Sequence, residues 1–296
     1  MKGFLVAVVA AVLTAVTLAT PAAAFPPSLV VVYDSEVNAD PQSFTFGKPV
    51  CPPGTHVLGA GADVIGGDHS IRIVGIKPDT QPTGDFVWTT AGGDSSQLRA
   101  PYSLDASAIC GGGVTGWQIV EASSPSDSGS EFAVATAACP AGKLVSGAGG
   151  RSWKPWYIVD SINISSDLTS VTVEVVTDAT FPPEQAGAQA FAYAICIDPL
   201  PGQQRVYAES VWDSSDKHVS VQCPRGARVI GLGGGLTGAA GGAYLDRLAP
   251  IAPDGSNLGS GLGFGGADID AREISSGAPQ NWRAYVYAVC VDALHN

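Results

Sequence analysis

Apolar and polar residues alternate along many short stretches of this chain. Within 282–289, Trp282 and the small or apolar residues at the even positions after it alternate with Arg283, Tyr285 and Tyr287. A period of two places successive side chains on opposite faces of a β-strand. No stretch shows a convincing 3.6-residue period of the kind that an amphipathic helix requires. The pattern therefore predicts an all-β protein.

The strand pattern belongs to a unit that occurs three times. Each copy opens with Cys-Pro-x-Gly-x-x-Val-x-Gly-x-Gly, starting at Cys51, Cys139 and Cys223, so the copies begin 88 and 84 residues apart. Each copy closes with a strand of the type Ala/Val-x-Ala-Ile/Val-Cys, which ends at Cys110, Cys196 and Cys290. These retained motifs predict three repeated β-sheet units of about 85 residues.

The repeat divides the chain into four segments. We expect a signal peptide at 1–24 and β repeats at 25–112, 113–200 and 201–296. The linkers between copies are short, whereas independent domains on flexible tethers need longer polar connections. We therefore expect a compact pseudo-threefold body in which each copy supplies one sheet, with separate domains as the alternative.

The opening motif combines a turn with a strand. Proline fixes φ, and the glycine two positions later accepts the positive φ that closes a tight turn. In the first copy, Gly59 and Gly61 then lie on one face of the strand, where another backbone or a bulky ring can approach closely. The motif is therefore expected to have a structural role in every copy.

Six cysteines allow 15 pairings, and the three copies select one scheme. Each opening cysteine is expected to bond the closing cysteine of its own copy: Cys51–Cys110, Cys139–Cys196 and Cys223–Cys290. On the chain-entropy argument each bond adds roughly 4 kcal/mol of stability. Free buried thiols are the alternative. A zinc site is disfavoured because no CxxC or HxxxH spacing occurs, and no metal is expected.

The first 24 residues have the features of a secretory signal. Lys2 precedes an apolar stretch, and Pro21 is followed by three alanines that suit signal peptidase. An uncleaved membrane anchor is the alternative, which the Ala- and Thr-rich composition and the lack of flanking positive charge disfavour. We therefore expect a secreted, extracellular protein, in surroundings where disulfides form.

The charge balance disfavours two classes of partner. Asp and Glu number 27 against 15 Lys and Arg, for a formal net charge of -12. Such a surface repels nucleic-acid phosphates and anionic lipids. We therefore expect no nucleic acid as a partner, no membrane insertion after signal removal, and a monomer.

The opening motif and the closing strand together resemble a module of secreted actinobacterial proteins of unknown function. This resemblance covers residues 28–292 and implies no particular activity. More distantly, three disulfide-closed β repeats resemble the vitelline membrane outer layer protein and other β-prism proteins, some of which bind sugars. That second resemblance implies a β-prism-like arrangement, and fold analogy alone is a weak argument for function.

Few residues suggest catalysis. Residues 233–238 match GxGxxG, but a Gly- and Ala-rich loop follows where a dinucleotide site needs a helix, so no cofactor is expected. Asp63, Asp68 and His69 form a small polar cluster that can hold a cation or act as an acid or base, although such a loop is more often a solvated turn. We lean against an enzyme. An extracellular hydrolase stays open because paired carboxyl groups meet in space rather than in sequence.

The copies differ in the loop that follows the Gly-rich strand. Copy two carries Trp153, Trp156 and Tyr157 there, beside Arg, Lys and Pro, whereas copies one and three have Gly-rich loops. Rings on a stiff loop suit stacking on sugars or a protein hot spot, and the alternative is that the Trp rings fill the core. We predict a non-enzymatic binding or cell-surface protein whose ligand is carbohydrate or envelope material. A protein-interaction or protease-inhibitor role with an extracellular protein is the alternative.

Overall fold

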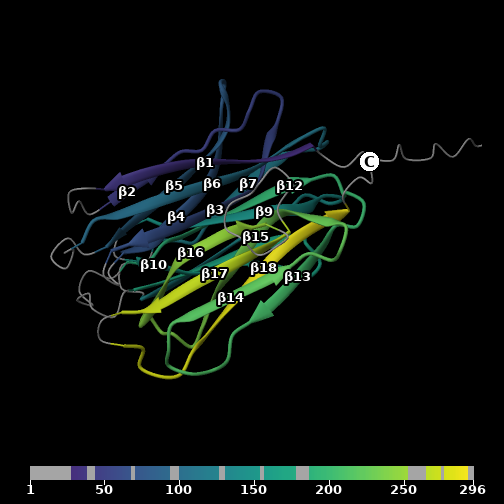
Figure 1. Ribbon diagram of the computed structural model, residues 1–296. Coiled ribbons are helices and arrows are strands. Elements are labelled where there is room, and N and C mark those ends of the chain that lie inside the picture. Colours follow the sequence, from purple (N-terminus) through teal and green to yellow (C-terminus); the bar gives the residue numbers. More distant parts are fainter. Residues whose placement is uncertain are drawn as a thin grey trace, which may run out of the picture.

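The computed structural model describes residues 28–38, 44–67, 71–93, 100–126, 131–153, 157–177, 187–252, 265–274 and 277–292. Within these ranges the chain forms eighteen β-strands (Figure 1). The same ranges contain no helix that is long and apolar enough to cross a membrane. The predicted signal peptide at 1–24 lies outside the described residues.

Each copy contributes six strands. Copy one forms β1 (Ser28–Asn38), β2 (Phe44–Gly47), β3 (His56–Gly66), β4 (Ile71–Gln81), β5 (Gly84–Gly93) and β6 (Tyr102–Gly112). Copy two forms β7 (Gln118–Ser123), β8 (Phe132–Ala138), β9 (Leu144–Ser152), β10 (Tyr157–Ile164), β11 (Ser170–Thr177) and β12 (Ala190–Ile197). Copy three forms β13 (Gln204–Glu209), β14 (Lys217–Gln222), β15 (Ala227–Thr237), β16 (Ala243–Ile251), β17 (Gly266–Glu273) and β18 (Arg283–Asp292).

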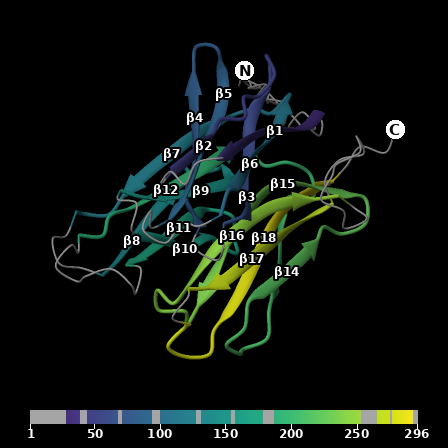
Figure 2. The ribbon, with the colours of Figure 1, turned by 60° about the vertical axis from the view of Figure 1, so that its left-hand side comes forward.

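The strands form three six-stranded sheets. Sheet A has the order β1-β6-β3-β16-β17-β14, sheet B the order β2-β5-β4-β9-β12-β7, and sheet C the order β13-β18-β15-β10-β11-β8. In every sheet the first, sixth and third strands of one copy meet the fourth, fifth and second strands of another copy. The pairing of copies rotates from sheet to sheet, which gives the molecule pseudo-threefold symmetry. Figure 2 shows β16 of copy three running beside β3 of copy one, with β17 on the far side of β16.

The expectation that each copy supplies one sheet is wrong, because every sheet is shared by two copies. The third strand of each copy pairs with the fourth strand of another copy: β3 with β16, β9 with β4, and β15 with β10. Because the three copies have similar strands, the sequence pattern does not distinguish pairing within a copy from pairing between copies. Because each copy contributes three strands to each of two sheets, removal of any one copy leaves two sheets incomplete.

The glycines of the opening motif lie where the third strands of the three copies approach one another. A Cβ added to Gly59 would lie 2.8 Å from the Cα of Gly231, and one added to Gly231 would lie 2.6 Å from the Cα of Gly147. A Cβ added to Gly147 would lie 2.8 Å from the Cα of Gly59, which closes the cycle. The three positions therefore surround the pseudo-threefold axis, and the predicted close approach of backbones is confirmed.

The cysteine motifs form the predicted turns and bonds. Gly54, Gly142 and Gly226 have φ values of +80°, +87° and +86°, as the turn requires. The disulfides join Cys51 to Cys110, Cys139 to Cys196 and Cys223 to Cys290, with a Cα–Cα distance of 5.7 Å in each. Each bond ties the turn before the third strand of a copy to the sixth strand, with which that third strand pairs.

Each sheet has an apolar face and a polar face. In β3, Ala60, Ala62 and Val64 belong to the hydrophobic core, so Asp63 between them lies on the opposite face. We call this second face the polar face. It carries Asp63 in sheet A, Arg151 in sheet B and Ser161 in sheet C.

Candidate functional site

One row of cross-strand neighbours crosses the polar face of each sheet where two copies meet. Residues opposite each other in adjacent strands lie on the same face, so the register defines the row. In sheet A it consists of Ser35, Asp105, Asp63, Arg247, Asp270 and His218. In sheet B it consists of Ser123, Phe191, Arg151, Gly75, Thr90 and Phe46. In sheet C it consists of Glu209, Tyr285, Gly235, Ser161, Glu174 and Val134.

The row of sheet A is an ion-pair network. Arg247 is only 7% exposed, and its guanidinium contacts the carboxylate of Asp63 and lies 2.9 Å from that of Asp268. His218 Nδ1 lies 2.6 Å from Asp270 Oδ1. Burial raises the pKa of Asp63 to about 6, and the charge of Arg247 opposes this rise. The buried cation of this face is thus neutralised by the protein's own carboxylates.

The row of sheet B joins an arginine to aromatic rings. The Arg151 guanidinium lies 4.0 Å from the ring centroid of Phe191 and 5.8 Å from that of Trp153. Arg151 Nε also donates to the hydroxyl of Tyr193 at 2.8 Å. Trp153 is 61% exposed and its ring centroid lies 6.0 Å from that of the buried Phe191. This face therefore presents the exposed ring of Trp153 beside a cation, and it also carries the exposed Phe46 and Trp88.

Three tyrosines pack against one another on the polar face of sheet C. The ring centroids of Tyr207, Tyr285 and Tyr287 lie 5.3, 5.4 and 6.3 Å apart. The Tyr285 hydroxyl donates to Asn163 Oδ1 at 2.7 Å, and the Arg205 guanidinium lies 4.3 Å from the ring centroid of Tyr287. Tyr207 is 45% exposed, whereas Tyr285 is 7% exposed. One exposed ring is thus supported by two neighbouring rings that are held by polar contacts.

An ion pair between Glu209 and Arg283 lies next to these tyrosines and links them to Trp212 in the following loop. Glu209 contacts the Tyr207 hydroxyl and lies 2.7 Å from Arg283 Nη1. The Arg283 guanidinium in turn lies 5.5 Å from the ring centroid of Trp212, which is 50% exposed. Burial, together with the contact to Glu209, raises the pKa of Tyr207 to about 12, so the phenol is neutral at physiological pH. We refer to Tyr207, Trp212, Tyr285 and Tyr287 as the aromatic cluster.

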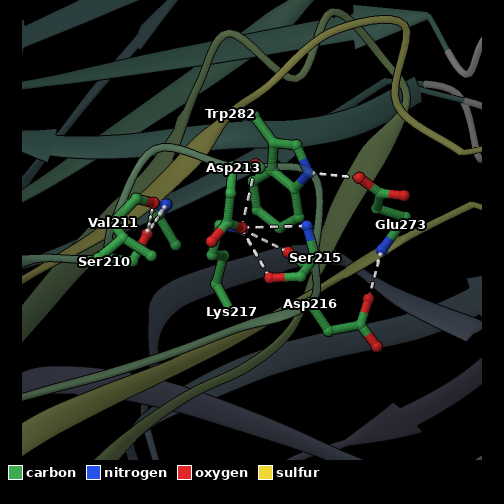
Figure 3. Close-up of polar contacts among 9 residues, drawn as sticks. Ser210, Val211, Asp213, Ser215, Asp216, Lys217, Glu273 and Trp282 are labelled. Atoms are coloured by element: carbon green, nitrogen blue, oxygen red, sulfur yellow. Dashed lines mark hydrogen bonds and ion pairs between the residues drawn. The ribbon is translucent and has the colours of Figure 1, made fainter.

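A buried lysine fixes the loop that carries Trp212. Lys217, the first residue of β14, is 5% exposed, and its ammonium contacts the carboxylate of Asp213 (Figure 3). The same ammonium donates to the backbone oxygens of Ser215 at 2.5 Å and Asp213 at 3.2 Å. This hydrogen bonding lowers the pKa of Asp213. The loop 210–216 is therefore closed around a cation that has little contact with water.

The Trp282 ring, which packs against the Lys217 ammonium, is also held in place by a hydrogen bond. Trp282 is fully buried, and the Lys217 ammonium lies 4.5 Å from the centroid of its ring. Trp282 Nε1 donates to Glu273 Oε1 at 2.7 Å, and the backbone nitrogen of Glu273 donates to Asp216 Oδ1 at 3.0 Å (Figure 3). These contacts tie the loop to β17 and to the start of β18. Trp212 is thus carried by an anchored segment.

The residues singled out from the sequence do not form one site. Asp63 is part of the ion-pair network of sheet A, and Trp153 is exposed on sheet B. Tyr157 is fully buried, so its ring packs in the interior instead of facing a ligand. Asp68, His69 and Trp156 lie outside the described residues.

Sequence reasoning does not single out the aromatic cluster, although one signal for it is present. The alternation within 282–289 places Tyr285 and Tyr287 on the face opposite the small apolar residues. The register of β13 against β18 sets Tyr207 opposite Tyr287. The sequence pattern does not predict this register. Without that register, the tyrosines of β18 look like isolated outward-facing residues.

A comparison of the chain with models of known protein families gives no match, and a comparison with curated proteins gives none either. In the part of the chain that the structure describes, no group of three or more His, Cys, Asp or Glu side chains is placed to hold a metal ion. The three polar faces therefore carry the chemistry from which a function can be inferred.

Proposed function

We propose that this protein is a secreted, non-enzymatic binding protein that recognises carbohydrate or envelope polysaccharide through the aromatic cluster of sheet C. The packing of the exposed Tyr207 against Tyr285 and Tyr287 carries the proposal, together with the exposure of Trp212 nearby. Aromatic rings combine a flat apolar face with a polar edge, which suits contact with a sugar ring. Such rings also lose little conformational entropy on binding.

Polar groups surround the rings and are held in place. Arg205, Glu209 and Arg283 flank the cluster and can donate to or accept from sugar hydroxyls. Arg283 and Glu209 already fix each other, and Lys217 anchors the loop of Trp212. Preorganisation of this kind lowers the entropic cost of binding.

The face of sheet B is the competing site, because Trp153 is exposed there. It presents Trp153 beside the buried Phe191, with the exposed Phe46 and Trp88 elsewhere on the same face. On sheet C, Tyr207 packs against two further tyrosines, and Trp212 is exposed nearby. The mutual packing of three tyrosine rings, which Arg205 and Asn163 hold by polar contacts, favours sheet C.

Secretion is supported by independent features. The first 24 residues have the pattern of a signal peptide. All six cysteines are joined in disulfides, which is typical of extracellular proteins.

A matched pair of variants tests the proposed site. Tyr33 and Tyr207 occupy equivalent positions in the first strands of copies one and three, and each is 45% exposed. The mature protein would be incubated with a panel of insoluble polysaccharides and cell walls, and retention would be measured by sedimentation. We expect Tyr207→Ala and Trp212→Ala to lower retention at least about tenfold, and Tyr33→Ala to retain wild-type binding.

The other outcomes of this assay have defined meanings. Loss of retention in Trp153→Ala but not in Tyr207→Ala would move the site to sheet B and refute the proposed one. Release of shortened products would indicate the hydrolase alternative. Retention on no polysaccharide, combined with capture of a defined extracellular protein, would indicate the protein-interaction alternative.

A further inference from the structure

Pseudo-symmetry allows the polar faces of sheets A and C to be compared position by position. Both β16 and β10 contain a β-bulge, at Asp246 and Asp160 respectively. A bulge sets two residues of one strand opposite one residue of its partner. In sheet A the opposing residue is Asp270, and in sheet C it is Glu174. Each face thus carries a pair of carboxyl groups at equivalent positions.

In sheet A both carboxyl groups have arginine partners. Asp246 pairs with Arg272, which lies on the neighbouring strand β17. Asp270 lies 4.0 Å from the Nε of Arg247. The register places the equivalents of these arginines in sheet C at Val176 and Ser161. Sheet C therefore keeps the acids and replaces both cations with uncharged side chains.

The two carboxyl groups of sheet C have no counterion from the described parts of the chain. Neither Asp160 nor Glu174 has an ion pair or a side-chain hydrogen bond there, although Asp160 is only 9% exposed. A buried carboxyl group without a partner is unfavourable when it is charged. Burial, followed by the charge of Glu174, accordingly raises the pKa of Asp160 to about 7. Glu174 is only half-buried, so the pair is not sealed from solvent.

The acid pair and the three tyrosines lie on the same face of sheet C. Asp160 is close enough to Tyr285 for its charge to raise the pKa of that phenol. Tyr285 in turn contacts Tyr207, and its hydroxyl donates to Asn163 on the same strand as Asp160. From β13 to β10 there are three strand spacings, or about 14 Å. An oligosaccharide of a few units is long enough to contact both ends.

We infer that Asp160 and Glu174 receive the ammonium group of a sugar that carries a free amine, while neighbouring units of the same chain stack on Tyr207 and Trp212. This inference rests on the proposed function and names its ligand class. The guanidinium groups of Arg272 and Arg247 in sheet A show that cations fit against carboxyl groups at these positions. Charge-assisted hydrogen bonds to a carboxylate are about twice as strong as neutral ones.

The test compares two ligands of equal length that differ only at nitrogen. Binding of a glucosamine hexasaccharide and of its fully N-acetylated form to the mature protein would be measured by calorimetry, with and without EDTA. We expect the free amine form to bind about tenfold more tightly than the acetylated form, because an amide cannot form an ion pair. Asp160→Asn and Glu174→Gln should abolish this preference while still binding the acetylated form. Glu121→Gln, on the polar face of sheet B, is the matched control and should keep it.

The outcomes separate the inference from the function on which it rests. Equal binding of both forms by the wild type, or an unchanged preference in Asp160→Asn, would overturn the amine site and leave the aromatic cluster intact. Loss of the preference when EDTA is added would assign the carboxyl pair to a metal and also overturn it. Binding of neither form would count against the proposed function itself.

Discussion

The unpaired carboxyl group of Asp160 makes a prediction about stability that does not depend on any ligand. Replacing it by Asn keeps the shape of the side chain but removes the charge. Burial raises the pKa of Asp160 from 3.8 to about 7, so the folded protein holds this proton at pH values where the unfolded chain has lost it. The stability gained from keeping Asp160 protonated is therefore fully present below about pH 4 and is lost as the pH rises through about 7.

The expected change in the free energy of unfolding follows from the same two pKa values, 3.8 and about 7. Each tenfold difference in proton affinity corresponds to about 1.4 kcal/mol, so the charged carboxylate costs at most about 4 kcal/mol above pH 7. Asn does not ionise and avoids this cost. We therefore expect Asp160→Asn to match the wild type at pH 4 and to exceed its free energy of unfolding by about 2–4 kcal/mol at pH 8.

Urea unfolding at several pH values between 2 and 8, with the disulfides intact, measures this difference. Asp167→Asn is a control of opposite sign, because hydrogen bonds from Ser165 and Thr169 lower the pKa of Asp167. Asp167 should stabilise the protein near neutral pH and lose that contribution in acid. A difference between wild type and Asp160→Asn that does not change with pH would refute the unpaired burial of this carboxyl group.

Three further predictions concern the scaffold. In Gly231→Ala the new Cβ would lie 1.8 Å from the backbone oxygen of Ser146, so the free energy of unfolding should fall by at least about 3 kcal/mol. At Gly142 an added Cβ would meet no atom within 4 Å, so Gly142→Ala should cost only about 1 kcal/mol. Removing Cys139 and Cys196 together should lower the free energy of unfolding by about 4 kcal/mol, and an unchanged value would contradict the chain-entropy argument. Lys217→Met should cost about 2 kcal/mol and weaken polysaccharide retention as much as Trp212→Ala does; normal retention would show that the loop needs no anchor.

The repeated motifs account for much of the fold that could be predicted from the sequence. The turns at Gly54, Gly142 and Gly226 and the three disulfides follow from residues retained in every copy. The close approach of backbones at Gly59 follows from its lack of a Cβ. Such features are local, or are selected by threefold repetition, and so leave a clear pattern.

The sharing of sheets could not be predicted in the same way. The pairing of β3 with β16 joins residues that are 184 positions apart, such as Asp63 and Arg247. The equivalent contact is Gly75 with Arg151 in sheet B and Ser161 with Gly235 in sheet C, so no common pair of residues marks the junction. A pattern search finds what the copies share, whereas these positions differ in every copy.

The aromatic cluster could not be predicted from the sequence for a related reason. Sequence comparison of the copies directs attention to loops of different sequence, such as the one that begins at Trp153. The structure shows that the copies also differ on their strands, along the central row of each polar face. Tyr207 joins Tyr285 and Tyr287 only through the register of β13 with β18.

Backbone NMR of residues 25–296, titrated with the glucosamine hexasaccharide, tests directly whether sheet C is the binding face. We expect shift changes confined to β10, β11, β13 and β18 and to the loop of Trp212, with the corresponding strands of sheets A and B unaffected. Shift changes centred on Arg151, Trp153 and Phe191, or spread equally over all three sheets, would contradict this expectation.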